Sequence, residues 1–135
     1  MNFFVDSSGW VGLFDPSDKY HSQAQSWMQS IIGQGHRFIT TDYVLDETIT
    51  DLQAAINHAT AESFVDWILI QKHVQVVHIT EAVWDEALAM FRKYDDKRFS
   101  FTDCTSFTVM GKMNLREAFA FDHHFEQMSF RLWPR

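Results

Sequence analysis

Residues 2–10 read NFFVDSSGW. An apolar run stops here at Asp6, and two serines and a glycine follow it. A short apolar run bounded by turn-forming residues is typical of a buried strand, and the polar residues after it are typical of a helix start. The stretch therefore predicts a buried first strand that leads directly into a helix, with Asp6 at the junction.

The alternation of strand and helix continues along the chain. Strands separated by helices predict parallel βαβ units, and hence a three-layer α/β fold in which helices flank a central parallel sheet of about five short strands. The strands are predicted at residues 2–5, 37–40, 74–79, 117–121 and 131–133. Beyond the first helix, helices are predicted at residues 18–32, from 41 or 42 onward, and at 60–72, 81–94, 100–111 and 123–128.

The composition fits one compact domain over residues 1–135. The chain is 46% hydrophobic and 21% charged, which allows a substantial core and argues against intrinsic disorder. No apolar run reaches the ~20 residues of a membrane-spanning helix. The N-terminus lacks the basic start of a signal peptide, and the lone Cys104 excludes a disulfide framework. We expect a cytoplasmic protein without a membrane segment.

The formal net charge of −7 has two interpretations. Nucleic-acid binders usually carry a basic surface, so the charge argues against simple binding to a phosphate backbone. A cluster of carboxylates held together by divalent cations gives the same negative count, because the ions cancel it locally. The charge alone does not choose between them.

Four acids are placed to meet at one edge of the predicted sheet. Asp6 follows the first strand and Asp122 follows the fourth, so both emerge at the carboxyl edge. Asp103 lies in the first turn of the helix that opens at SFTDCTS, and Glu47 lies one to two turns into the helix TTDYVLDETITDL. Ligands of open parallel sheets bind beyond this edge, so the four carboxylates are expected in one cleft.

Clustered carboxylates indicate a divalent metal. Like charges this close do not all stay ionised without compensation, and Mg²⁺ and Mn²⁺ prefer oxygen ligands. Each acid taken alone is explained as a cap, a turn former or a solvated charge. Capping does not explain acids at two strand ends in the same cleft. The cluster therefore predicts metal-assisted phosphodiester hydrolysis.

Four segments together resemble the VapC-type PIN-domain ribonucleases. They are DSSGWVGLFD at 6–15, TTDYVLDET at 40–48, SFTDCTSFTVM at 100–110 and FDHHFEQMSF at 121–130. They follow the family's order at comparable spacing and span the length of the chain. No single segment is specific, whereas the four together are strong.

The resemblance implies roles for six residues. Ser7 and Ser100 match hydroxyl residues that bind phosphate, order a metal-bound water or simply start a helix. The four acids match the quartet that holds one or two Mg²⁺ or Mn²⁺ ions: Asp6, Glu47, Asp103 and Asp122. Family members cut RNA, often transfer or ribosomal RNA, and leave a 5′-phosphate. An antitoxin protein silences them, and they commonly form homodimers. The resemblance thus implies a metal-dependent endoribonuclease, the toxin of a VapBC-type pair.

The main alternative is a catalytically inactive PIN-fold module that binds RNA or a protein partner. Such a module keeps the fold and loses the metal. The intact quartet argues against it, because a binding module gains nothing from four mutually repelling carboxylates. A Mg²⁺ or Mn²⁺ affinity that disappears in Asp6→Ala separates the two functions.

Charged residues outside the quartet receive simpler interpretations. The basic residues of RKYDDKR at 92–98, with Lys112 and Arg116, are the best candidates for phosphate contacts, although an ordinary solvated helix end is slightly favoured. Asp51 lies one turn beyond Glu47 on the same helix face, and a solvated position is favoured for it.

His123 and His124 follow the fourth acid directly. They lack the i, i+4 spacing of a zinc-binding helix, so the pair is interpreted as incidental, with a small chance that His123 assists the substrate.

The aromatic side chains at helical spacings predict mainly core positions. They are Trp10, Trp27, Trp67, Trp84 and Phe91. Some are candidates for a groove that takes an antitoxin helix or for a dimer seam, above all Trp10 with Leu13 and Phe14. Cys104 is predicted to be a small buried packing residue.

Overall fold

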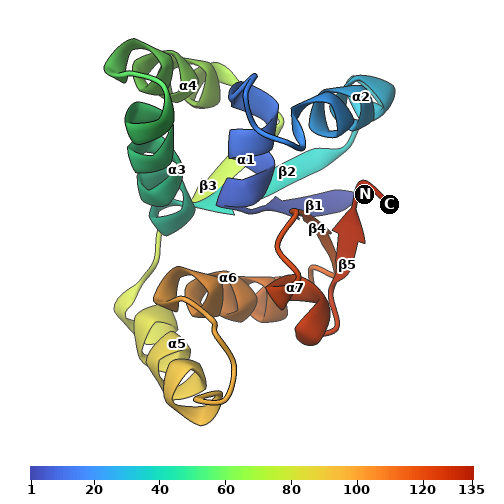
Figure 1. Cartoon of the computed structure of the whole chain (residues 1–135). Coiled ribbons are helices and arrows are strands. Elements are labelled where there is room, and N and C mark those ends of the chain that lie inside the picture. Colours follow the sequence, from blue (N-terminus) through green and yellow to red (C-terminus); the bar gives the residue numbers. More distant parts are fainter.

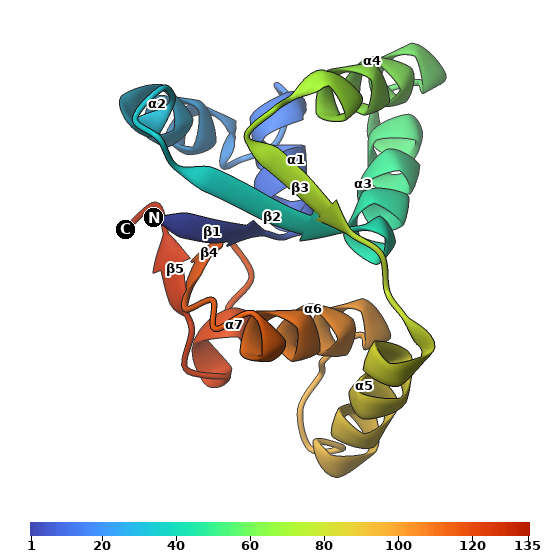
Figure 2. The same cartoon turned by 180° about the vertical axis from the view of Figure 1, so that it is seen from behind.

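The structure, a computed structural model, describes residues 1–135 and has three layers (Figure 1 and Figure 2). A five-stranded sheet lies in the middle. Helices α1 to α4 cover one face, α6 and α7 cover the other, and α5 packs outside α6. The predicted three-layer α/β fold is confirmed. None of the helices is both long and apolar enough to cross a membrane.

The elements follow one another in the predicted alternation. The strands are β1 (Asn2–Val5), β2 (Arg37–Thr41), β3 (Val74–Val77), β4 (Glu117–Phe119) and β5 (Arg131–Trp133). The helices are α1 (Ser7–Phe14), α2 (His21–Ile31), α3 (Asp42–Ala55), α4 (His58–Ile70), α5 (Glu81–Lys93), α6 (Phe101–Lys112) and α7 (His124–Gln127).

The strand order reverses between β1 and β4. All pairs are parallel, in the order β3-β2-β1-β4-β5. The chain moves from β1 outward to β2 and β3, and then crosses to β4 on the other side of β1. Open parallel sheets bind ligands at such a reversal. Val5 pairs in register with Phe119, so the residues that follow these strands leave the sheet at the same edge.

Two strands end two residues earlier than predicted, and side chains explain both ends. The backbone N–H of Phe121 donates to the Ser8 hydroxyl (3.0 Å) instead of continuing the ladder of β4. The backbone N–H of Ile79 donates to the Asp42 carboxylate (2.9 Å) beyond the end of β3. Hydrophobic periodicity does not report such long-range polar contacts.

Trp10 anchors α1 in the core. Its ring is completely buried, and Nε1 donates to the Thr40 hydroxyl (3.2 Å), which in turn donates to the Val5 carbonyl (3.0 Å). The buried indole therefore has its hydrogen-bond partner. The predicted core position of Trp10 is confirmed, and its ring also lines an apolar cavity of about 250 Å³.

The predicted core positions of the other large aromatic residues are only partly correct. Trp27 and Trp67 pack partly buried against the core, and Cys104 is buried as predicted. Trp84 and Phe91, however, are 39% and 45% exposed. They lie on α5 at the margin of its contact with α6, where both rings meet that of Phe101 and remain partly open to solvent.

Gly9 lets α1 approach the sheet closely, and this contact predicts a stability difference. A Cβ at Gly9 would lie 2.5 Å from the carbonyl oxygen of Phe119 in β4. We expect Gly9→Ala to lower the free energy of unfolding by about 1–3 kcal/mol, because backbone has to move to relieve the overlap. Denaturant unfolding measures the change.

Gly111 in α6 is the matched control, because a Cβ there would meet nothing within 4 Å. Gly111→Ala should raise the free energy of unfolding by about 0.5–1 kcal/mol, as alanine does in an open helix position. Equal effects of the two substitutions would contradict the close approach of α1.

Candidate active site

A polar cavity of about 340 Å³ lies at the strand reversal. It collects all six residues that the sequence singled out, from segments spread over more than a hundred positions of the chain. Only one lining residue, Val11, is apolar. The others are Asp6, Ser7, Ser8, Glu47, Asp51, Arg98, Ser100, Asp103, Asp122 and His124.

Asp6 occupies the junction between β1 and α1 and is 2% exposed. Its carboxylate caps α1 by accepting from the backbone N–H (3.2 Å) and the hydroxyl (2.7 Å) of Ser8. The same Ser8 hydroxyl accepts from the N–H of Phe121, which ties the cap to the loop after β4. The capping interpretation is thus correct for Asp6, and it coexists with a place in the cavity.

Burial raises the pKa of the Asp6 carboxyl to about 7. The hydrogen bonds from Ser8 oppose this rise, and the nearby charges of Asp103 and Glu47 add to it. The pKa of the Asp103 carboxyl is also raised, mainly by burial, although the N–H of Ser100 and the ring of His124 counteract it. Both acids therefore bind a proton more readily than an exposed carboxyl does, because nearby positive charge does not offset their burial.

Asp103 and Ser100 form a capping box at the start of α6. The Ser100 hydroxyl accepts from the N–H of Asp103 (3.0 Å), and the Asp103 carboxylate accepts from the N–H of Ser100 (3.0 Å). Two unpaired N–H groups of the first turn are satisfied in this way. The structure places Ser100 as a helix cap that also lines the cavity.

Glu47 reaches the cavity from the middle of α3. The Ser7 hydroxyl donates to its carboxylate. Partial burial raises the pKa of Glu47, the bond from Ser7 opposes this, and the charges of Asp51, Asp103 and Asp122 add to it. Asp51 is exposed, as favoured from the sequence, yet it lines the cavity one turn beyond Glu47, and partial burial raises its pKa.

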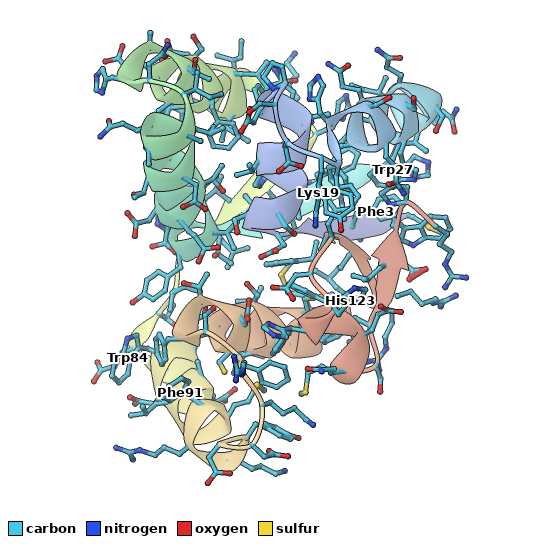
Figure 3. The ribbon with its side chains drawn as sticks, viewed as in Figure 1. Phe3, Lys19, Trp27, Trp84, Phe91 and His123 are labelled. Atoms are coloured by element: carbon cyan, nitrogen blue, oxygen red, sulfur yellow. The ribbon has the colours of Figure 1, made fainter.

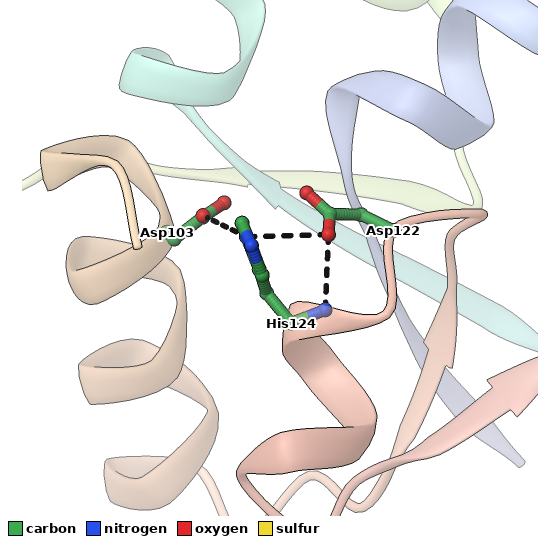
Figure 4. A group of neighbouring side chains, drawn as sticks. All are labelled: Asp103, Asp122 and His124. Carbon is green, nitrogen blue, oxygen red and sulfur yellow. Dashed lines mark hydrogen bonds and ion pairs between the residues drawn. The ribbon is translucent and has the colours of Figure 1, made fainter. Parts of the chain in front are cut away.

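Asp122 lies between β4 and α7. One of its oxygens accepts from the backbone N–H of His124 (2.9 Å), so this acid also shapes the short helix that follows it. Its side chain is 33% exposed and faces the cavity opposite Asp103 (Figure 4).

The interpretation of His124 as incidental is wrong. Its Nδ1 lies 2.8 Å from Asp103 Oδ2 and 3.2 Å from Asp122 Oδ1 (Figure 4). His123 instead extends into solvent, 84% exposed, beside Glu126. The sequence feature that could have identified His124 is its position two residues after Asp122, at the start of a one-turn helix. A search for the i, i+4 spacing of zinc-binding helices does not detect it.

The basic candidates separate into one cavity residue and several distant ones. Arg98 lines the cavity from the loop between α5 and α6. Lys112 pairs with Glu86 (3.0 Å) at the far end of α6, and Arg92 lies in the last turn of α5. Only Arg98 is therefore in place to contact an anion held in the cavity.

Cys104 supplies no nucleophile to this site. Burial, together with the charge of Asp103, raises the pKa of its thiol to about 11. The thiol stays protonated at neutral pH and is a poor nucleophile in that form. The cavity offers carboxylates, hydroxyls, one guanidinium and one imidazole, a donor set that fits divalent cations with oxygen preference.

The raised pKa of Asp6 predicts how stability depends on pH. The Asp6 carboxyl has a pKa of about 7 in the folded chain and about 3.9 in the unfolded chain, so it binds its proton more tightly when folded. Its contribution to the free energy of unfolding therefore falls as pH rises from about 4 to about 7. Asp6→Asn removes the loss. In EDTA, its stability relative to wild type should rise between pH 5 and pH 8 by a few kcal/mol at most. Thermal unfolding measures this, and parallel pH profiles would contradict it.

Comparisons with known proteins place this geometry in a family. Residues 3–131 match the PIN domain. The 23S rRNA-specific endonuclease VapC20 of Mycobacterium tuberculosis is 32% identical over 127 residues, 94% of each chain. A VapC ribonuclease of Archaeoglobus fulgidus is 24% identical over 118 residues, 86% of this chain and 74% of that one.

Solved structures agree with the sequence matches. The crystal structure of VapC20, described as a sarcin-ricin loop cleaving toxin, superposes with a TM-score of 0.87 at 31% identity, over 95% of each chain. VapBC2 of Rickettsia felis has a TM-score of 0.70 at 10% identity, over 98% of this chain and 97% of that one, and shows the fold alone. The match over nearly the whole length shows that this chain belongs to the PIN-domain family, among its VapC-type members.

Proposed function

We propose that this chain is a Mg²⁺- or Mn²⁺-dependent endoribonuclease that acts in the cytoplasm as the toxin of a VapBC-type pair, and that residues 1–135 form one catalytic PIN domain. The observation that carries the proposal is the meeting of four carboxylates in one cavity at the strand reversal. They come from the junction of β1 with α1, from α3, from α6 and from the loop after β4, at the edge where α/β sheets bind their ligands. Relatives named as nucleases support the same chemistry.

Asp6, Glu47, Asp103 and Asp122 are the residues that would hold the cation. When bound, one or two such ions lower the pKa of a water ligand and stabilise charge on the departing oxygen of a phosphodiester. The chain's own groups position these carboxylates. Ser8 orients Asp6 and Ser7 orients Glu47 by hydrogen bonds to their oxygens, and no protein nucleophile takes part.

The substrate class follows from the relatives. The 32% identical VapC20 is a 23S rRNA-specific endonuclease, and its structure is described as that of a sarcin-ricin loop cleaving toxin. We therefore take a structured ribosomal RNA as the first substrate to test. A looped RNA presents unstacked bases and a bent backbone to the cavity, which a regular helix does not.

Cleavage of 23S rRNA by the purified chain tests the function. We expect discrete cuts in Mg²⁺ or Mn²⁺, their loss in EDTA, and a decrease of at least about 100-fold in Asp6→Asn, because one metal ligand is lost. Asp15→Asn is the matched control. Asp15 is likewise buried and accepts from a nearby serine, Ser17 (2.7 Å), but lies outside the cavity, so its variant should keep wild-type cleavage. Identical cleavage by wild type and Asp6→Asn would instead support the non-cutting module.

Arg98 is proposed to bind a substrate phosphate at the rim of the cavity. Arg98→Ala should lower kcat/KM for RNA by roughly tenfold, the loss of one hydrogen-bonded charge contact, and should reduce the slope of log binding constant against log salt by about 0.7–1. Arg92→Ala removes the same charge from α5, away from the cavity, and should change neither value much. Equal losses in both variants would contradict a phosphate contact at Arg98 and indicate that only the net charge of the protein matters.

The antitoxin is proposed to bind at the opposite edge of the sheet. An apolar cavity of about 250 Å³ lies there between α2 and α4, with Trp67 and Phe38 in its lining. Ile32 at the end of α2 and Leu69 at the end of α4 are 55% and 73% exposed beside these elements. Trp10, which was expected in an antitoxin groove, lines this cavity, whereas Leu13 and Phe14 do not. Leu69→Glu should weaken antitoxin binding, because it places a charge beside this apolar surface. Copurification of the antitoxin with the variant and with wild type measures the difference.

The homodimer is proposed to form through α5. Trp84 and Phe91 are partly exposed on α5 (Figure 3). Their rings lie 5.2 and 6.2 Å from that of Phe101. A second copy of the chain would cover this aromatic face symmetrically. Light scattering of Trp84→Glu against wild type measures whether the dimer depends on it.

A further inference from the structure

His124 is held in the cavity by contacts that leave one ring nitrogen aimed at the acids. Its backbone N–H donates to Asp122 (2.9 Å), which sets the start of α7. Its ring meets that of Phe99 edge to face, at 5.3 Å and 76°. The side chain is 26% exposed, so the ring is largely enclosed. Nδ1 therefore faces the carboxylates, and because their oxygens only accept, Nδ1 donates the ring proton to Asp103 in this structure. A ring that binds a cation through Nδ1 carries its proton on Nε2 instead.

The spacing around Nδ1 resembles one face of a metal coordination shell. Octahedral Mg²⁺ has ligands at about 2.0–2.1 Å, so neighbouring ligand atoms lie roughly 3.0 Å apart. Nδ1 lies 2.8 Å from an oxygen of Asp103 and 3.2 Å from an oxygen of Asp122. One potential ligand atom from each of these three residues lies within 4.8 Å of the others. Atoms from two separate elements thus converge on one point.

We propose that His124 supplies a nitrogen ligand to the divalent metal, beside Asp103 and Asp122, and that this nitrogen makes the site prefer Mn²⁺ to Mg²⁺. The inference rests on the proposed function only in that the cavity binds a divalent cation. Imidazole nitrogen is a softer ligand than carboxylate oxygen, and it suits transition metals better than Mg²⁺. The acids alone would form an all-oxygen site, and His124 would turn it into a mixed nitrogen and oxygen site.

The simpler role for His124 is to hold the Asp103 carboxylate by a hydrogen bond. That role predicts no bond between nitrogen and metal and an equal weakening of both ions when the ring is removed. Ligation predicts a direct nitrogen coupling to the metal and a loss that falls mainly on Mn²⁺.

Electron spin echo spectroscopy of the Mn²⁺-loaded full chain tests the proposal. We expect modulation from a coordinated imidazole nitrogen in wild type, with its frequencies changed when histidine is labelled with ¹⁵N. This comparison needs no substitution, so it holds even if a variant folds poorly. His124→Gln should lose the imidazole coupling. The control His123→Gln should keep it, because the His123 side chain is 84% exposed and pairs with Glu126 instead of the cavity acids.

Titration calorimetry supplies the second readout. His124→Gln should weaken Mn²⁺ binding by roughly tenfold or more, the scale seen when groups around a metal are removed, and should weaken Mg²⁺ binding by much less. Thermal unfolding of both variants without metal checks that they are folded. The proposal is overturned if wild type shows no imidazole coupling, if His124→Gln retains it, if the two ions weaken equally, or if Mn²⁺ does not bind.

RNA cleavage measured in parallel separates this inference from the proposed function. Nitrogen coupling without RNA cleavage would retain the ligand and reject the ribonuclease. Mn²⁺-dependent cleavage without nitrogen coupling would retain the ribonuclease and reject His124 as a ligand.

Discussion

The parallel pairing of β1 with β4 is the constraint on which the acidic cavity depends. Val5 lies opposite Phe119, so the chain leaves both strands at the same level of the sheet, and Asp6 and Asp122 follow within three residues. The helices attached to these two halves cover opposite faces. Glu47 therefore arrives from one layer and Asp103 from the other, and a single strand pair gathers acids from four segments.

The acids owe their fixed positions to the beginnings of helices. Asp6, Asp103 and Asp122 each accept a backbone N–H at a helix start, so the N–H groups left free there orient the three carboxylates. These hydrogen bonds offset only part of the cost of burying like charges, since burial still raises the pKa of Asp6 and Asp103. A folded chain with an uncompensated cavity gains stability from any cation that binds it.

Local features of the sequence predicted most of the fold and the members of the acidic cluster. β1 has the predicted bounds, because an apolar run is a local property of the sequence. β3 and β4 end two residues earlier than predicted, because long-range hydrogen bonds end them. The role of His124 depends on Asp103, which lies 21 positions earlier. The exposure of Trp84 depends on which helix covers α5. Neither is encoded in spacing along one helix, so both needed the three-dimensional arrangement.

The Ser8 hydroxyl joins two segments that are 113 positions apart in the chain, because it donates to Asp6 and accepts from the N–H of Phe121. The first turn of α1 and the loop after β4 are thereby linked into one cooperative unit. Local opening of either segment removes a partner from the other. The positions of Asp6 and Asp122 in the cavity are therefore coupled through one hydroxyl group.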